Sequence, residues 1–96
     1  MSEADGSASV VRTVRICNPR GLHARAAAKF VKCAGTFSAD VTVAREGTSV
    51  SGLSIMGLMM LAAANGSEIE IRAAGSDAAA ASAAPCKLVE AGFDET

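Results

Sequence analysis

Two kinds of apolar pattern along the chain predict four strands. Residues 10–16 are rich in branched apolar side chains, and residues 68–72 alternate strictly between polar and apolar, as half-buried strands do. Residues 40–44 and 48–51 predict two more strands, joined by a short hairpin turn at residues 45–47. Because a tight hairpin joins antiparallel strands, we expect an antiparallel sheet.

Two further segments have the composition and spacing of helices. Residues 24–34 place apolar side chains at helical intervals, and Gly35 follows as a stop signal. The apolar run 55–64 follows Ser54, whose hydroxyl can cap a short helix that ends before Asn65. We therefore expect one helix after the first strand and a second one after the hairpin.

A third helix is predicted in the alanine-rich segment that runs toward residue 91. Ser76 and Asp77 are expected to cap its start. Pro85 should kink or split it, because proline donates no backbone hydrogen bond. The element order is then β-α-β-β-α-β-α, and helices gathered on one face of an antiparallel sheet make a two-layer α+β sandwich.

The length and composition limit what the chain can be. Its 96 residues are enough for one modest core but not for a multidomain enzyme. We expect a disordered tail over residues 1–9, one domain over residues 10–92 and a second tail over residues 93–96. The polar start lacks the features of a secretory signal, and the apolar run 55–64 is too short to cross a membrane. Three scattered cysteines indicate a reduced, cytoplasmic protein, and we expect a monomer.

Charge is unevenly distributed although the net charge is only −1. Residues 6–39 contain no acidic side chain and six of the nine basic ones, namely Arg12, Arg15, Arg20, Arg25, Lys29 and Lys32. Such a basic segment favours an anionic ligand or an acidic protein partner. Nucleic acid is not expected, because no aromatic side chain is placed to stack on bases and the whole chain is not basic.

His23 is the only histidine, and it stands at or just before the start of the first predicted helix. Backbone N–H groups and the positive end of the helix dipole meet there, so the position suits a phosphoryl group carried on the imidazole. Arg20 and Arg25 are near enough in sequence to neutralise phosphoryl oxygens. A histidine that only caps the helix is the alternative, and the residues alone leave both open. No cluster of metal-ligand residues accompanies His23, so we expect no metal and no cofactor.

The segment that begins at Ser54 offers a second site and a contact surface. Ser54 can be a helix cap and also a phosphorylation site, because a helix N-terminus tolerates added negative charge. The apolar run that follows is too continuous to be buried on one face. Some of it should therefore face outward, with Met56 and Met59 as the expected contacts.

Two motifs in register resemble a known family. Residues 18–25 (NPRGLHAR), followed by AAKFV at residues 27–31, resemble the active-site signature of HPr, the histidine phosphocarrier of the bacterial phosphoenolpyruvate-dependent phosphotransferase system. Residues 54–59 (SIMGLM) resemble the helix that holds the family's regulatory serine. The resemblance covers residues 10–92 and implies an open-faced, four-stranded antiparallel sheet covered by three helices.

The resemblance implies a role for each matching residue. His23 matches the histidine that enzyme I phosphorylates on Nδ1, and Arg25 matches the arginine that contacts the phosphohistidine. Ser54 matches the serine that HPr kinase/phosphorylase modifies in some bacteria. Contacts with enzyme I and with a IIA protein are implied for Arg20, Ala24, Ile55, Met56 and Met59. The chain would then be a phosphoryl carrier and not an enzyme.

Some residues depart from the usual family pattern, and others indicate one branch of the family. Ala26 occupies a position where the family usually has proline, at little structural cost. Residues 22–26 (LHARA) and 54–61 (SIMGLMML) look more like the nitrogen-related branch, called NPr, and its alphaproteobacterial relatives. In that branch the phosphoryl group passes to a regulatory IIA protein, and sugar transport is not necessarily involved. The resemblance gives Pro85 no function.

Other interpretations of the sequence stay open. One is a regulatory module of the same fold that binds a partner through the Met-rich helix without being phosphorylated. Another is a domain that binds an anionic metabolite between Arg20, Arg25 and Lys29. A hydrolase that pairs Cys17 with His23 is a third, but the sequence shows no residue to orient the pair or to stabilise an oxyanion.

Overall fold

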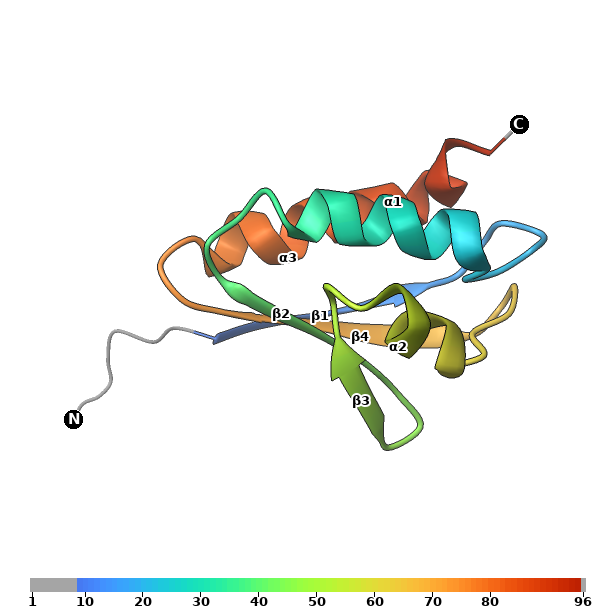
Figure 1. Ribbon diagram of the computed structural model, residues 1–96, viewed down its shortest axis with the longest axis horizontal. Coiled ribbons are helices and arrows are strands. Elements are labelled where there is room, and N and C mark those ends of the chain that lie inside the picture. Colours follow the sequence, from blue (N-terminus) through green and yellow to red (C-terminus); the bar gives the residue numbers. More distant parts are fainter. Residues whose placement is uncertain (1–8, 96) are drawn as a thin grey trace.

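The structure, a computed structural model, describes residues 9–95 and contains a four-stranded antiparallel sheet. Its strands are β1 (Ser9–Arg15), β2 (Asp40–Arg45), β3 (Thr48–Ser51) and β4 (Glu68–Ala74). They lie in the order β1-β4-β2-β3, so the first and last strands pair with each other and the β2–β3 hairpin forms the other side (Figure 1). Alternate residues of β4 point into the core, because successive side chains of a strand face opposite sides of the sheet.

Three helices cover one face of this sheet. They are α1 (Ala24–Ala34), α2 (Ile55–Met60) and α3 (Ala78–Glu90), and a short 3-10 turn, η1 (Gly92–Asp94), follows α3. α1 and α3 lie side by side, and the smaller α2 packs on α1 next to the hairpin (Figure 1). In the described part of the chain no helix covers the other face. The predicted open-faced α+β sandwich is therefore confirmed.

The core lies between the sheet and the helices. Its largest fully buried side chains include Ile16, Phe30, Leu58, Ile71 and Phe93. Burying a side chain of this size contributes roughly 1.5–3 kcal/mol. Phe93 falls in the segment that we expected to be a tail, so this segment packs on the domain instead of extending away from it.

Several element boundaries agree with the prediction and others differ. α1 and β3 have the predicted limits, and the Ser54 hydroxyl caps α2 by accepting a hydrogen bond from a first-turn N–H at 2.9 Å. β1 begins at Ser9, inside the segment expected as a disordered tail; the rest of that segment, residues 1–8, lies outside the described residues. The hairpin turn has only two residues, Glu46 and Gly47. Both have positive φ, which matches the twist of the flanking strands.

The second helix is shorter than the apolar run that predicted it. It ends at Met60, because Ala62 adopts a left-handed conformation with φ +52° and the chain turns. Leu61 and Ala63 are buried, and the Ala63 carbonyl accepts a hydrogen bond from the Leu22 N–H at 2.9 Å. The end of the run therefore packs against the loop before α1 instead of extending the helix.

Pro85 does not split the last helix, contrary to the prediction. α3 is continuous from Ala78 to Glu90 (Figure 1). The proline ring is fully buried in the core, and its apolar contacts compensate for the backbone hydrogen bond that proline cannot donate.

Asp77 precedes α3, but its carboxylate does not cap that helix as predicted. It accepts hydrogen bonds from the backbone N–H groups of Ser38 at 2.8 Å and Ala39 at 2.7 Å, in the loop between α1 and β2. These bonds, that of Ser38 above all, hold the pKa of Asp77 below its usual range. Asp77 therefore ties together two loops at one end of the domain.

Replacing Asp77 with asparagine is expected to lower the free energy of unfolding at neutral pH. Because the pKa of Asp77 is lower in the folded chain than in the unfolded chain, its contribution is complete above about pH 4 and is lost as the pH falls through the folded value. Urea unfolding of the wild type and of Asp77→Asn, at neutral pH and at about pH 2.5, measures this. Asp40→Asn removes an exposed carboxylate and is the control. An equal difference between wild type and variant at both pH values would refute the assignment.

Candidate functional site

The loop of residues 18–22 delivers His23 to the start of α1. Asn18 is buried; its side chain donates to the Gly21 carbonyl at 2.8 Å, and the Gly21 N–H donates to the Asn18 carbonyl at 3.1 Å. Gly21 has φ +65°, and a Cβ there would lie 2.5 Å from the Ala63 carbonyl oxygen. Glycine is therefore required both for the conformation and for the close approach of the two backbones.

His23 is the N-cap residue of α1. Its backbone is extended, with φ −77° and ψ 179°, and its Nδ1 accepts a hydrogen bond from the Arg25 N–H at 3.3 Å. Its Nε2 hydrogen-bonds to a carboxylate oxygen of Glu95. An ionised carboxylate can only accept, so in the neutral ring the proton belongs on Nε2 and the lone pair on Nδ1. The side chain is 16% exposed, which leaves part of the ring within reach of solvent.

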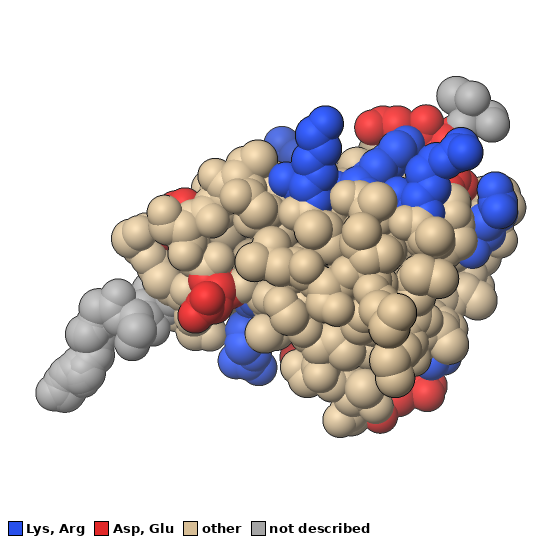
Figure 2. All heavy atoms as spheres, viewed as in Figure 1, with Lys and Arg blue, Asp and Glu red and all other residues tan. Residues whose placement is uncertain are grey.

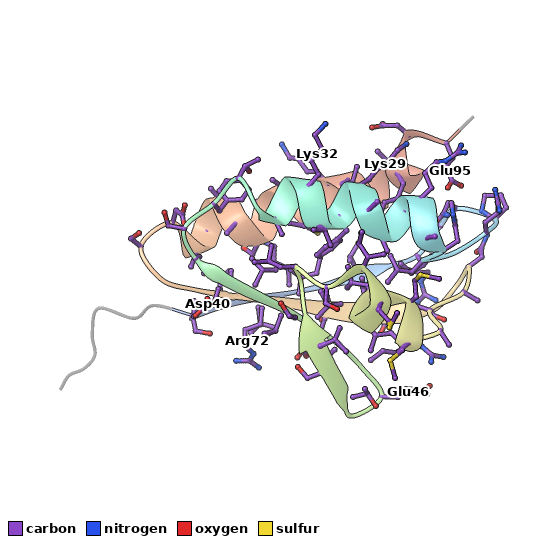
Figure 3. The ribbon with its side chains drawn as sticks, viewed as in Figure 1. Lys29, Lys32, Asp40, Glu46, Arg72 and Glu95 are labelled. Carbon is purple, nitrogen blue, oxygen red and sulfur yellow. The ribbon has the colours of Figure 1, made fainter. Side chains whose placement is uncertain are left out.

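Glu95 belongs to the site, and the sequence analysis missed it. The burial of Phe93 brings Glu95 over the start of α1 (Figure 3). Its other carboxylate oxygen accepts a hydrogen bond from the Asn18 side chain at 3.1 Å. The hydrogen bond from His23, then that from Asn18 and the charge of Arg20, hold the pKa of Glu95 below its usual range. A phenylalanine within a short polar segment was the one signal that could have indicated this packing.

A hollow of about 250 Å³, which we call the basic hollow, lies beside the histidine. It is lined by Arg20, His23, Arg25, Lys29, Asp94 and Glu95. Arg20 and Arg25 are exposed, whereas Lys29 donates to the Phe93 carbonyl at 2.7 Å. Basic side chains follow the edge of the molecule that α1 forms (Figure 2). Three of the lining side chains are basic and two are acidic, so the hollow has an excess of positive charge, which favours an anion.

The other basic residues of the acid-free segment are not part of this hollow. The Arg12 guanidinium donates to the Ser82 hydroxyl at 2.8 Å, and Arg15 forms an exposed ion pair with Glu68 at 3.3 Å. Lys32 lies further along α1 and points outward (Figure 3). The acid-free segment is therefore not one continuous surface. Lys32 lines a separate hollow between α1 and α3 together with Lys29 and Lys87, and the part around His23 is the one beside the imidazole.

An apolar surface borders His23 on another side. A second hollow, of about 260 Å³, is lined by Arg20, Leu22, His23, Met59 and residues 62–64. Met59 belongs to a row of exposed apolar side chains on and just before α2, which we call the apolar patch: Leu53, Ile55, Met56, Met59 and Met60. The sequence analysis named three of them and missed Leu53 and Met60. Ala24, at the start of α1, is also exposed. An exposed apolar patch beside charged side chains is typical of a protein-binding surface.

Among the described residues, the structure does not support a hydrolase that pairs Cys17 with His23, or a metal site. The three cysteines are free thiols, and the hydrogen bonds of Cys17 are to the carbonyls of Val89 and Glu90 at the end of α3, not to His23. Within residues 9–95, no group of three His, Cys, Asp or Glu side chains could hold a metal ion. Over the same residues, none of the helices has the length and apolar character needed to span a bilayer.

Comparison with known proteins gives a consistent result. Residues 10–91 match the family described as "PTS HPr component phosphorylation site". The chain is 45% identical over 84 residues to phosphocarrier protein NPr of Shewanella violacea, which covers 88% of this chain and 92% of that protein. It is 45% identical over 84 residues to phosphocarrier protein HPr of Neisseria meningitidis serogroup A, covering 88% and 94%. The crystal structure of HPr-C-His from Thermoanaerobacter tengcongensis superposes with a TM-score of 0.86 at 38% identity, covering 91% and 98%.

The fold and the site together are those of a histidine phosphocarrier: an open-faced sandwich with a histidine at the start of its first helix, between a basic hollow and an apolar patch. The chain belongs to the HPr family and is a phosphocarrier protein of the bacterial phosphotransferase system.

Because the backbone at Gly21 lies close to the Ala63 carbonyl, adding a single methyl group at residue 21 should strongly lower the stability of the fold. Gly21→Ala is expected to lower the free energy of unfolding by about 2–3 kcal/mol, because the Cβ meets backbone atoms and φ is positive. Gly47→Ala is the matched control: its φ is +85°, but a Cβ there meets nothing within 4 Å, so only about 1 kcal/mol should be lost. Urea unfolding measures both. Equal losses would mean that the contact with Ala63 does not shape the loop.

Proposed function

We propose that Nδ1 of His23 accepts a phosphoryl group from enzyme I and passes it to a IIA protein of the nitrogen-related branch. The observation that carries this proposal is the position of Nδ1, which accepts a hydrogen bond from the Arg25 N–H in the first turn of α1, beside the basic hollow. Exposed N–H groups and the helix dipole stabilise negative charge there. Because His23 is the only histidine of the chain, no other residue can form a phosphohistidine.

The transfer uses the lone pair of Nδ1. As Nδ1 attacks phosphorus, the P–N bond of the donor phosphohistidine breaks and its electron pair stays on the donor nitrogen. The phosphoryl oxygens then accept the Arg25 N–H hydrogen bond that Nδ1 accepts in the free protein. The exposed guanidinium groups of Arg20 and Arg25 neutralise the added charge. Transfer to the IIA protein is the same step with donor and acceptor exchanged.

A carrier has to hold the phosphoryl group without burying it. The histidine is partly exposed and the two arginines are exposed, which leaves a partner room to approach in line with the P–N bond. The apolar patch, with Arg20 and Ala24 beside it, gives donor and acceptor one shared surface. Contacts on such a surface should be modest in area and short-lived. The protein is thus a substrate of its partners, not an enzyme with its own turnover, and we assign it to the cytoplasm as a monomer.

Support for the nitrogen-related branch comes from the motifs LHARA at residues 22–26 and SIMGLMML at residues 54–61. The similarity to the NPr of Shewanella violacea agrees with it. HPr of Neisseria meningitidis matches at the same 45% identity, so the choice of acceptor has to be decided by transfer to a nitrogen-regulatory or a sugar-specific IIA protein.

Intact-mass spectrometry after incubation with phosphoenolpyruvate and enzyme I tests the proposal. Wild type should gain one acid-labile phosphoryl group, and His23→Ala should gain none. Adding a nitrogen-regulatory IIA protein should then remove the group faster than adding a sugar-specific one does. No uptake by the wild type would refute the carrier role of His23, and faster transfer to the sugar-specific protein would refute the choice of branch.

Ser54 is proposed as a regulatory site, with HPr kinase/phosphorylase as the modifying enzyme. Its hydroxyl caps α2, and the residues that follow it, Ile55 and Met56, belong to the apolar patch. A phosphate on Ser54 adds almost two negative charges at a helix start, which the helix tolerates. The charge stands at the rim of the shared surface, where it would repel an acidic face of enzyme I.

Ser54→Asp imitates this charge and keeps the cap, because aspartate caps helices as well as serine does. We expect the variant to unfold at an unchanged urea concentration but to accept phosphate from enzyme I about tenfold more slowly than wild type. Ser76→Asp adds the same charge at an exposed serine before α3 and should be phosphorylated at the normal rate. If enzyme I phosphorylated Ser54→Asp at the wild-type rate, the regulatory role of Ser54 would be refuted.

A further inference from the structure

Glu95 reaches the histidine from a segment 72 positions further along the chain. Its carboxylate hydrogen-bonds to Nε2 of His23, whereas the proposed transfer uses Nδ1. The two nitrogens of the ring therefore have separate partners: the Arg25 N–H at the start of α1 for Nδ1, and the Glu95 carboxylate for Nε2.

The carboxylate itself is held in place by the fold. Its second oxygen accepts a hydrogen bond at 3.1 Å from Asn18, which is only 2% exposed and is fixed by its bond to the Gly21 carbonyl. Two residues before Glu95, the fully buried Phe93 anchors the segment, and Lys29 donates to the Phe93 carbonyl at 2.7 Å. These contacts of the side chain and of the backbone restrict the orientations in which the carboxylate can meet the ring.

We propose that Glu95 is a positioning residue for phosphoryl transfer, which aims the Nδ1 lone pair and balances the positive charge that the ring gains. This inference rests on the function proposed for His23. A carboxylate that accepts the Nε2 proton selects the tautomer and the rotation of the ring. Nδ1 is then unprotonated and directed at the start of α1, so the ring already has the orientation needed for transfer when the donor docks.

The charge balance of the step gives the carboxylate its second role. When the bond between Nδ1 and phosphorus forms and the donor's P–N bond breaks, the ring of His23 still carries its proton on Nε2 and becomes positive. Glu95 faces that proton and stabilises the charge. Arg20 and Arg25 line the same hollow and serve the phosphoryl oxygens, with Lys29 and Asp94 completing its wall.

Glu95→Ala and Glu95→Gln test the proposal, with Glu90→Gln as the matched control because Glu90 is an exposed carboxylate at the end of α3. The rate of phosphorylation by enzyme I and phosphoenolpyruvate is measured over a range of carrier concentrations. With Glu95→Ala as the substrate, we expect the kcat of enzyme I to fall about tenfold and its KM for the carrier to stay within about twofold. The fall should be smaller with Glu95→Gln, whose amide oxygen can still accept a hydrogen bond. Glu90→Gln should match the wild type, and circular dichroism verifies that each variant is folded.

A second readout separates positioning from mere stabilisation of the fold. The ¹⁵N chemical shifts of the neutral His23 ring report which nitrogen holds the proton. We expect Nε2–H alone in the wild type and in Glu90→Gln, and a measurable share of the Nδ1–H tautomer in Glu95→Ala, where only the Arg25 N–H still favours a proton on Nε2.

The experiments test the positioning role of Glu95 separately from the carrier role of His23. The positioning role of Glu95 would be overturned if the kcat of enzyme I with Glu95→Ala equalled or exceeded that with the wild type. A lower kcat with unchanged ¹⁵N shifts of the His23 ring would overturn it too. If the wild type itself takes up no phosphoryl group, the role of His23 fails, and the ring shifts still decide whether Glu95 controls the tautomer.

Discussion

The close approach of the loop 18–22 to the backbone at Ala63 is the constraint on which the site depends. The positive φ of Gly21, its missing Cβ and the hydrogen bond from Leu22 to the Ala63 carbonyl bring two distant segments together. One segment begins α1 and the other follows α2. His23 thereby lies between a basic hollow and an apolar patch, and neither surface alone would serve a phosphoryl carrier.

The site reconciles a precise ring orientation with access for protein partners. Precision comes from two buried groups, the Asn18 amide and the Phe93 ring, which hold the partly exposed Glu95 carboxylate against Nε2. Access comes from exposed groups, the guanidinium of Arg25 and the apolar patch. In the transfer that we propose, ordered neighbours lower the cost of aligning the ring, and exposed arginines follow the phosphoryl group as it moves between proteins.

Local signals in the sequence were enough for most of the fold and for the motif around His23. α1 has the predicted limits because its apolar spacing and its start and stop signals agree, and the cap at Ser54 is a contact over three residues. The end of α2 was missed, because the left-handed turn at Ala62 arises from docking on a distant loop. The partners of Asp77 and Glu95 lie 39 and 72 positions away, and no local pattern encodes such contacts.

The most direct test of this account is to determine which nitrogen of His23 carries the phosphoryl group. Protein labelled with ¹⁵N in its single histidine is phosphorylated by enzyme I and phosphoenolpyruvate, and the coupling between ¹⁵N and ³¹P is measured by NMR. The account predicts coupling to Nδ1 while Nε2 keeps its proton. Coupling to Nε2, or phosphate on a residue other than His23, would contradict it.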